Sequence, residues 1–222
     1  GNVTFSTVVV RADAAQAARE LSKFMYDPSV THMKAARHCL AYLVQHKDLG
    51  ITYEHGDFIG VHGKLVPNGD VEVYSDASFA EDVLSRRSTS GYASVKNKAA
   101  ISWGCKGQSK VALSTGDAEL RALCRAFAEV KWIRKLVLLF SNRAKLSEKR
   151  GADEDYEVLP PTKLWEDNRS TISWVKNPIA HEKVKHIDVP LKALREAHAE
   201  FQSIYVDYPK ANLQLADGMT KS

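Results

Sequence analysis

The chain has 222 residues, of which 44% are hydrophobic and 26% are charged, and its formal net charge is +4. These values are ordinary for a globular protein and exclude wholesale disorder, and the length allows one large domain or one domain with an appendage. The small positive charge permits a nucleic-acid partner without requiring one.

The distribution of cysteine and apolar residues argues against two further classes of protein. Cys39, Cys105 and Cys124 lie far apart and form no CxxC pair, so we interpret them as buried thiols of a reducing compartment, not as disulfide partners or zinc ligands. No stretch approaches 18 consecutive apolar residues, as a membrane-spanning helix would require. Because the chain starts at Gly1 without methionine, we interpret it as a fragment of a longer polypeptide.

Residues 1–66 predict an accessory segment made mainly of helices. Residues 1–11 are rich in β-branched side chains and predict a tail or an edge strand. Residues 13–25, rich in alanine and leucine, predict a helix that ends at Asp27-Pro28. Residues 31–46 carry apolar side chains at helical spacing, and residues 47–57 suggest a short strand. This segment contains no recognisable catalytic cluster.

Residues 67–222 predict an α/β domain, which begins at a turn signal in residues 67–70. A long helix to about residue 140 is expected after three strands, with Ser114 as its N-cap and Asp117 at the N3 position of a capping box. Asn97-Lys98 is a plausible hairpin connection between the second and third strands. The predicted strands are residues 71–76, 91–96 and 99–104.

The remaining elements complete a mixed sheet flanked by helices. Residues 141–161 are charged and rich in turn formers, which indicates a flexible loop. The order of elements, βββ-α-β-α-α-β-α, is typical of helices packed around a mixed sheet. The elements after the loop are a strand at 162–167, helices at about 169–177 and 188–200, a strand at 202–208 and a terminal helix.

Four acidic residues stand at the ends of these elements. Asp76 and Asp167 end two predicted strands, while Glu119 and Asp217 lie in the first turns of two helices. Carboxylates are the ligands that Mg²⁺ prefers, and two such ions can activate water and stabilise the leaving oxygen in phosphodiester hydrolysis. We therefore expect the four side chains to converge on divalent cations.

Each acid also has an ordinary explanation. An aspartate at a strand end is often a turn or cap residue, and a glutamate in a first helical turn complements the helix dipole. Asp117 competes with Glu119 for the helical position, but the capping box already explains Asp117. Glu119 shares a helix face with Ala122 and Leu123, which points it toward the sheet, so we favour Glu119.

Five blocks of residues 71–221 resemble, in order, the ribonuclease H domain of copia-type LTR retrotransposon polyproteins. The upstream stretch DPSVTHMKAARHCLAYLVQHKDLGITY resembles the end of the reverse transcriptase of the same family, in its thumb or connection region. Residues 1–12 match the pattern poorly. The five blocks are YSDASFAEDVLSRRSTSGY, AAISWGCKGQSKVALSTGDAEL, LWEDNRSTISWVKNP, HEKVKHIDV and LQLADGMTK.

The resemblance implies a ribonuclease H-like fold that hydrolyses the RNA strand of RNA–DNA hybrids with Mg²⁺ or Mn²⁺, two ions. The metal-binding and catalytic acids of the family carry over onto Asp76, Glu119, Asp167 and Asp217, and none is substituted. Many ribonucleases H have a histidine in a flexible loop before the last aspartate. Here that stretch is YPKANLQLAD, so a proton must be shuttled otherwise or by water, which lowers the expected rate.

Polar residues around the acids are candidates for nucleic-acid contacts. Cations and hydroxyls are suited to phosphates and 2′-hydroxyls across the minor groove of a hybrid, although an exposed polar loop or a helix cap would look the same. His181, His186 and Asp188 fit no zinc spacing, so we expect a structural or substrate-loop role for them. The candidate contacts are Arg86, Arg87, Ser88, Ser90, Gln108, Ser109, Asn168 and Arg169.

The resemblance also implies partners and a location. The expected partners are an RNA–DNA hybrid and the reverse transcriptase portion of a parent polyprotein, with no membrane and no small-molecule cofactor. The expected location is a virus-like particle in the cytoplasm, or the nucleus. Two rival interpretations remain open: a domesticated or inactive module that binds nucleic acid or protein without cutting, and a DNA-strand transferase on the same fold. Strand transferases usually rely on three acids, so four favour the hybrid-cleaving interpretation.

Overall fold

The computed structural model describes residues 2–54, 58–59, 65–66, 70–140, 159–177, 188–209 and 213–221. Its centre is a five-stranded mixed sheet with the strand order β5-β4-β3-β6-β7. Strands β3, β4 and β5 form an antiparallel meander, while β6 pairs parallel to β3 and β7 pairs parallel to β6. The strands are β3 (Val71–Ser78), β4 (Thr89–Lys96), β5 (Ala99–Gly107), β6 (Thr162–Glu166) and β7 (Ile204–Asp207).

The hairpin between β4 and β5 has the predicted connection. Asn97 and Lys98 both have positive φ angles, 52° and 63°. Two consecutive residues of this kind define the turn whose twist matches that of the flanking strands. Asparagine tolerates this conformation better than most residues, and the prediction at Asn97-Lys98 is confirmed.

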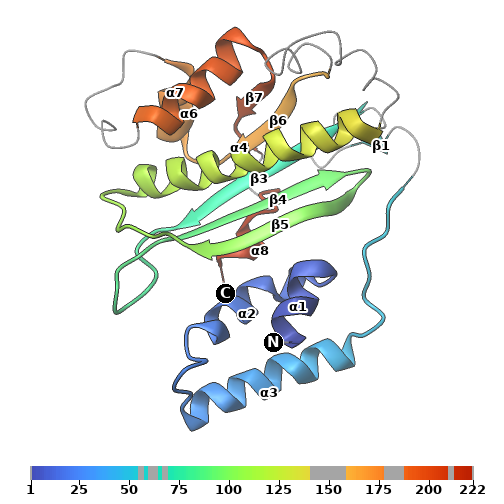
Figure 1. Cartoon of the computed structure of the whole chain (residues 1–222), viewed down its shortest axis with the longest axis vertical. Helices are drawn as coiled ribbons and strands as arrows, with labels where there is room; N and C mark the ends of the chain where they lie inside the picture. The colour runs from blue at the N-terminus through green and yellow to red at the C-terminus, as the bar shows by residue number, and fades with distance from the viewer. Residues whose placement is uncertain are drawn as a thin grey trace.

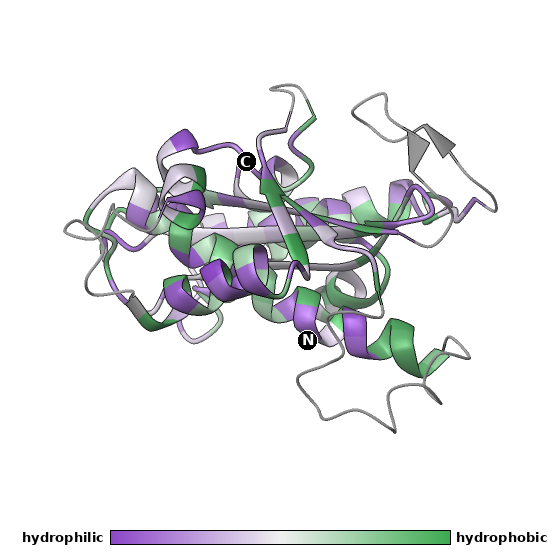
Figure 2. Ribbon diagram, turned by 90° about the horizontal axis from the view of Figure 1, so that it is seen from above, coloured by the Kyte–Doolittle hydropathy of each residue, from purple (hydrophilic) through white to green (hydrophobic). Residues whose placement is uncertain are grey.

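One face of the sheet is covered by α4 (Thr115–Phe140), α6 (Arg169–Lys176), α7 (Asp188–Arg195) and the π-helical turn η4 (Glu196–Glu200) (Figure 1). These helices carry hydrophobic and hydrophilic residues on the same element, as Figure 2 shows. Their apolar sides meet the strands in the main core, where Leu120 and Leu123 of α4 pack with Val73 and Leu164. All four side chains are fully buried.

The opposite face is covered by α8 (Asp217–Thr220) over β3 and β4 and by α2 (Ala15–Ser22) over β5 (Figure 1). Trp103 of β5 donates a hydrogen bond from its indole nitrogen to the carbonyl oxygen of Thr7, at 2.7 Å. Two ion pairs make further contacts: Arg19 pairs with Glu81 at 3.5 Å, and Lys23 pairs with Asp82. The other N-terminal elements are α1 (Asn2–Val9), η1 (Ala12–Ala14) and α3 (Val30–Gln45).

The predicted order of elements in residues 71–221 is confirmed, and so is the α/β class with its mixed sheet flanked by helices. Two predictions upstream are wrong. Residues 2–9 form α1, not a strand, because their β propensity yields to packing against α2. Residues 47–54 contain no strand; β1 (Phe58–Ile59) and β2 (Leu65–Val66) come later.

These observations do not test two other expectations. The division of the chain into segments 1–66 and 67–222 stays a prediction, and most of the predicted loop, residues 141–158, lies outside the described residues. Among the helices that the structure describes, none combines the length and the apolar character needed to cross a membrane.

Close contact between α8 and β4 depends on a glycine in the strand. A Cβ atom added to Gly91 would lie 2.6 Å from Cγ2 of Thr220 and 2.7 Å from Cβ of Met219. The carbonyl oxygen of Ala216 would lie at 3.3 Å. Since Cβ atoms do not approach this closely, any larger residue at this position must push α8 away from the sheet.

Replacing Gly91 with alanine should therefore destabilise the protein by about 1–3 kcal/mol, because the core side chains have no room to move. Urea denaturation measures this change. Gly218→Ala is the matched control, because no atom lies within 4 Å of its added Cβ. That control should be neutral or stabilising by up to about 1 kcal/mol, since alanine favours the helix. Equal stability of the Gly91→Ala and wild-type proteins would contradict the close packing of α8.

Candidate metal centre

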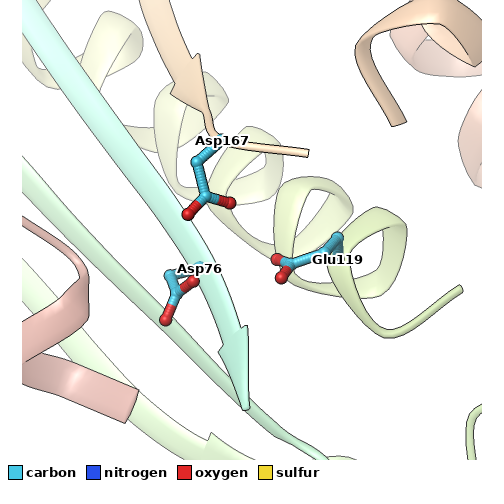
Figure 3. Close-up of side chains that lie close together, drawn as sticks. All are labelled: Asp76, Glu119 and Asp167. Atoms are coloured by element: carbon cyan, nitrogen blue, oxygen red, sulfur yellow. The ribbon is translucent and has the colours of Figure 1, made fainter. Parts of the chain in front are cut away.

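Three carboxylates from separate elements meet at one edge of the sheet. They belong to Asp76 of β3, Glu119 of α4 and Asp167, which follows β6 directly. One oxygen of each lies within 4.8 Å of the others, and Figure 3 shows the three side chains pointing toward one another. The sequence analysis expected four carboxylates to converge, and the structure brings these three together.

The parallel pairing of β3 with β6 brings the two aspartates together. Ser75 lies opposite Glu166 in this pair, so the next residue of each strand, Asp76 and Asp167, comes to the same edge. Parallel strands carry equivalent residues on the same face of the sheet. The backbone register therefore fixes the spacing of the two carboxylates.

The start of α4 supplies the third carboxylate. The backbone N–H of Asp117 donates to Oγ of Ser114 at 3.1 Å, as the predicted N-cap requires. The other half of the predicted capping box differs, because Oδ2 of Asp117 accepts from the backbone N–H of Leu113 at 2.8 Å. Oδ1 of Asp117 accepts a hydrogen bond from Arg121, so both carboxylate oxygens of Asp117 have partners within the protein. Glu119, in contrast, joins the two aspartates.

Burial makes these carboxylates hard to ionise without a cation. It raises the pKa of Asp76 and Asp167 above the ordinary value, and the negative charge of Asp217 raises both further. Burial and the neighbouring acids raise the pKa of Glu119 to about 10. Oε2 of Glu119 is buried and has no hydrogen-bond partner among the residues that the structure describes. A divalent cation would satisfy this oxygen and relieve the repulsion, so the residues fit such an ion.

Asp217 lies beside this group but is not one of the three convergent carboxylates. Its side chain is 41% exposed, and its Oδ1 accepts a hydrogen bond from Nζ of Lys221 at 2.6 Å. The neighbouring Thr220 donates a hydrogen bond to Oδ2 of Asp76. Upstream, Gln214 donates to the carbonyl oxygen of Ser75 at 2.9 Å. These contacts tie the segment that carries Asp217 to the end of β3.

Glu166 is a buried acid at this site that the sequence analysis missed. It has no exposed surface, and its Oε2 accepts from Oγ of Ser75 at 2.8 Å. Its Oε1 accepts from the backbone N–H of Asn168 at 3.0 Å, while burial raises its pKa well above the usual range. Strand alternation carried the signal, because Glu166 shares the core-facing side of β6 with Leu164.

Three of the predicted nucleic-acid contacts are buried in hydrogen bonds within the protein. Oγ of Ser88 accepts from the backbone N–H of Ala80 at 3.0 Å. The amide nitrogen of Gln108 donates to Oγ of Ser90 and to the carbonyl oxygen of Ala118, both at 2.9 Å. These bonds join β4, the residue after β5 and the start of α4.

The other five predicted contacts lie nearer the surface. Arg86, Arg87, Ser109 and Arg169 are exposed. Asn168 is the N-cap of α6 and accepts from the backbone N–H of Thr171. All eight contacts with nucleic acid stay predictions. His181 and His186, and the side chain of Asp188, lie outside the described part of the chain.

A mixed sheet with convergent acids at the end of a parallel strand pair defines the class of this protein, an α/β domain whose acids fit a hard cation. No family model matches the chain. Curated relatives do: the chain is 31% identical over 221 residues to the Retrovirus-related Pol polyprotein from transposon TNT 1-94 of Nicotiana tabacum. It is 28% identical over 211 residues, 95% of this chain, to the Pol polyprotein from transposon RE1 of Arabidopsis thaliana.

The homologues that span the whole chain are copia-type retrotransposon Pol polyproteins, and the resemblance stated from its motifs is confirmed. The chain spans only 15% of the tobacco polyprotein and 13% of the Arabidopsis one. A shorter relative is the Secreted RxLR effector protein 161 of Plasmopara viticola, 39% identical over 133 residues. That alignment covers 60% of this chain and 87% of the effector.

Two solved ribonuclease H structures are similar at a low level. One is the N-terminal RNase H domain of a Mycobacterium tuberculosis protein fused to maltose-binding protein, with 11% identity. It covers 68% of this chain and 90% of that chain, with a TM-score of 0.44. The other is LC11-RNase H1 in complex with an RNA/DNA hybrid, with 10% identity, 68% and 93% coverage, and a TM-score of 0.44. Likeness at this level supports no conclusion about function.

The raised pKa of Glu119 predicts the pH dependence of stability in the metal-free protein. Its pKa is about 10 when folded and ordinarily 4.5, so between these values the folded state holds a proton that the unfolded chain releases. The free energy of unfolding should therefore fall as the pH rises through this window, by up to about 1.4 kcal/mol per pH unit. Urea denaturation in EDTA at pH 6 and pH 8 measures the fall.

Glu119→Gln removes the ionisable group and should lose less stability than the wild type over the same interval. Glu200→Gln, which changes an exposed glutamate, is the matched control and should follow the wild type. A Glu119→Gln protein whose stability falls as steeply as that of the control would show that Glu119 is not protonated in the folded state.

Proposed function

We propose that this domain hydrolyses the RNA strand of RNA–DNA hybrids, with divalent metal ions, during reverse transcription of a retrotransposon. The observation that carries the proposal is the meeting of Asp76, Glu119 and Asp167. Among the described residues, Oε2 of Glu119 is buried there without a hydrogen-bond partner. Similarity to retrovirus-related Pol polyproteins supports the same reaction, which the resemblance of the motifs to copia-type ribonuclease H domains implies.

Four side chains would hold the cations: Asp76, Glu119, Asp167 and Asp217. Two Mg²⁺ or Mn²⁺ ions bound there would supply an activated water and stabilise the leaving 3′-oxygen of the RNA. The protein contributes rigid positions, because two of the acids are set by the β3–β6 register and the third by the capped start of α4. Fixed carboxylates of this kind need no reorganisation during the reaction.

The exposed predicted contacts are assigned to the phosphates of the hybrid. Arg86 and Arg87 precede β4, and Arg169 follows Asp167 by two residues. These arginine side chains therefore lie on chain segments between the acids. Exposure and positive charge suit them to this role, in which binding weakens as salt concentration rises. The reverse transcriptase portion of the parent polyprotein is the second proposed partner. We propose a virus-like particle in the cytoplasm, or the nucleus, as the location.

A competing proposal is a module that binds nucleic acid or protein without cutting. One specific observation favours it: the chain covers most of a relative whose name designates a secreted effector. The complete set of four acids weighs against it, since a binding module has no need to keep buried carboxylates together at a cost in stability.

Cleavage of an RNA–DNA hybrid, labelled separately on each strand, separates the two proposals. We expect cutting of the RNA strand alone, dependent on Mg²⁺ or Mn²⁺ and abolished by EDTA. Asp76→Asn and Asp167→Asn should each lower the rate by more than about a hundredfold, because each removes a charged metal ligand. Hybrid binding, measured by fluorescence anisotropy, should stay within a few-fold of the wild type.

Asp207→Asn is the matched control, because Asp207 also ends a strand of the sheet but pairs with Lys176 away from the three acids. Its rate should equal that of the wild type. Full activity in both acid variants would refute the site assignment. A folded protein that binds the hybrid but never cuts it would establish the binding module instead.

A further inference from the structure

Lys221 brings a positive charge into contact with the acids. Its Nζ lies 2.6 Å from Oδ1 of Asp217 and 4.0 Å from Oδ1 of Asp76. Among the ion pairs of the described residues, these are the pairs that involve the four proposed metal ligands. Lys221 follows α8 directly, and its backbone N–H donates to the carbonyl oxygen of Asp217 at 2.8 Å. The position of its ammonium group is therefore set by the same helix that carries Asp217.

The ammonium group of Lys221 pairs with Asp217 and also lies near Asp76. Partial burial lowers the pKa of Lys221, but hydrogen bonding to Asp217 and the charges of Asp76 and Asp167 outweigh burial, so the pKa is raised and the side chain stays charged. The side chain remains 56% exposed, so no packed neighbour blocks it from leaving Asp217. Lys221 is thus an exposed counter-charge to the acids, not a buried structural lysine.

A divalent ion that used both Asp76 and Asp217 could not share this space with the ammonium group. Mg²⁺ holds its oxygen ligands at about 2.0–2.1 Å, so both carboxylates would have to turn toward one point. Two cations only a few ångströms apart repel each other strongly in a partly buried site. Binding there requires Lys221 to release Asp217.

We propose that Lys221 is a built-in competitor of the metal ion between Asp76 and Asp217, a positioning residue that keeps the acids compatible with one another until the ion displaces its ammonium group. The proposal rests on the proposed metal-dependent function, and it adds a charge that regulates loading of the site. It accounts for the position of Asp217, whose Oδ1 pairs with Lys221 beside the three convergent carboxylates.

Calorimetric titration of the nucleic-acid-free protein with MnCl₂ tests the competition. Lys221→Gln should bind Mn²⁺ about five- to tenfold more tightly than the wild type, because one competing charge is removed. Lys135→Gln is the matched control for net charge, since Lys135 is exposed and lies about 24 Å along the axis of α4 from Glu119. The control should bind within twofold of the wild type.

A second measurement follows the lysine itself. Acetic anhydride labelling, read by mass spectrometry, should modify Lys221 slowly in EDTA and several-fold faster in Mg²⁺, while labelling of Lys135 should not change. Unchanged or weaker Mn²⁺ binding by Lys221→Gln, beside a wild type that binds normally, would overturn the role of Lys221 alone. Failure of the wild type and of every variant to bind Mn²⁺ would overturn the proposed function as well.

Discussion

Repulsion among buried carboxylates is the constraint on which the rest of this structure depends. Negative charges that avoid one another in solution are brought within a few ångströms by the β3–β6 register and the start of α4. The surrounding bonds offset this repulsion: Thr220 donates to Asp76, Ser75 donates to Glu166, and Lys221 pairs with Asp217. Hydrophobic packing between α4 and the sheet also holds the elements that carry the acids in place.

Much of this arrangement could be predicted because local patterns and tertiary packing agree. The turn at Asn97-Lys98 and the cap at Ser114 each have a local cause, and each lies where it was predicted from the sequence. The meeting of Asp76, Glu119 and Asp167 was expected because each lies near the end of one of these elements. Elements predicted consistently at several levels are those that fold as expected.

The failures occurred where a contact between distant segments decides the outcome. Residues 2–9 are rich in valine and threonine, yet they form a helix that packs against α2 and accepts a hydrogen bond from Trp103 at Thr7. Glu166 was missed for the same reason, since its partner Ser75 lies on another strand. The tie between Lys221 and Asp76 joins opposite ends of the domain, so no sequence pattern announces it.

The parallel pairing of β3 with β6 joins segments that lie far apart in the chain. Ser75 and Glu166 are 91 residues apart in the chain, and Gln214 reaches Ser75 across 139 residues. The β3–β4–β5 meander closes through short turns, whereas these long-range contacts must first overcome the entropy of closing large loops. The contacts that gather the acids therefore carry the largest loop-closure cost in the sheet. An ion that bound only the assembled acids would stabilise the folded chain by mass action and would gain nothing from a chain in which β3 and β6 are still apart.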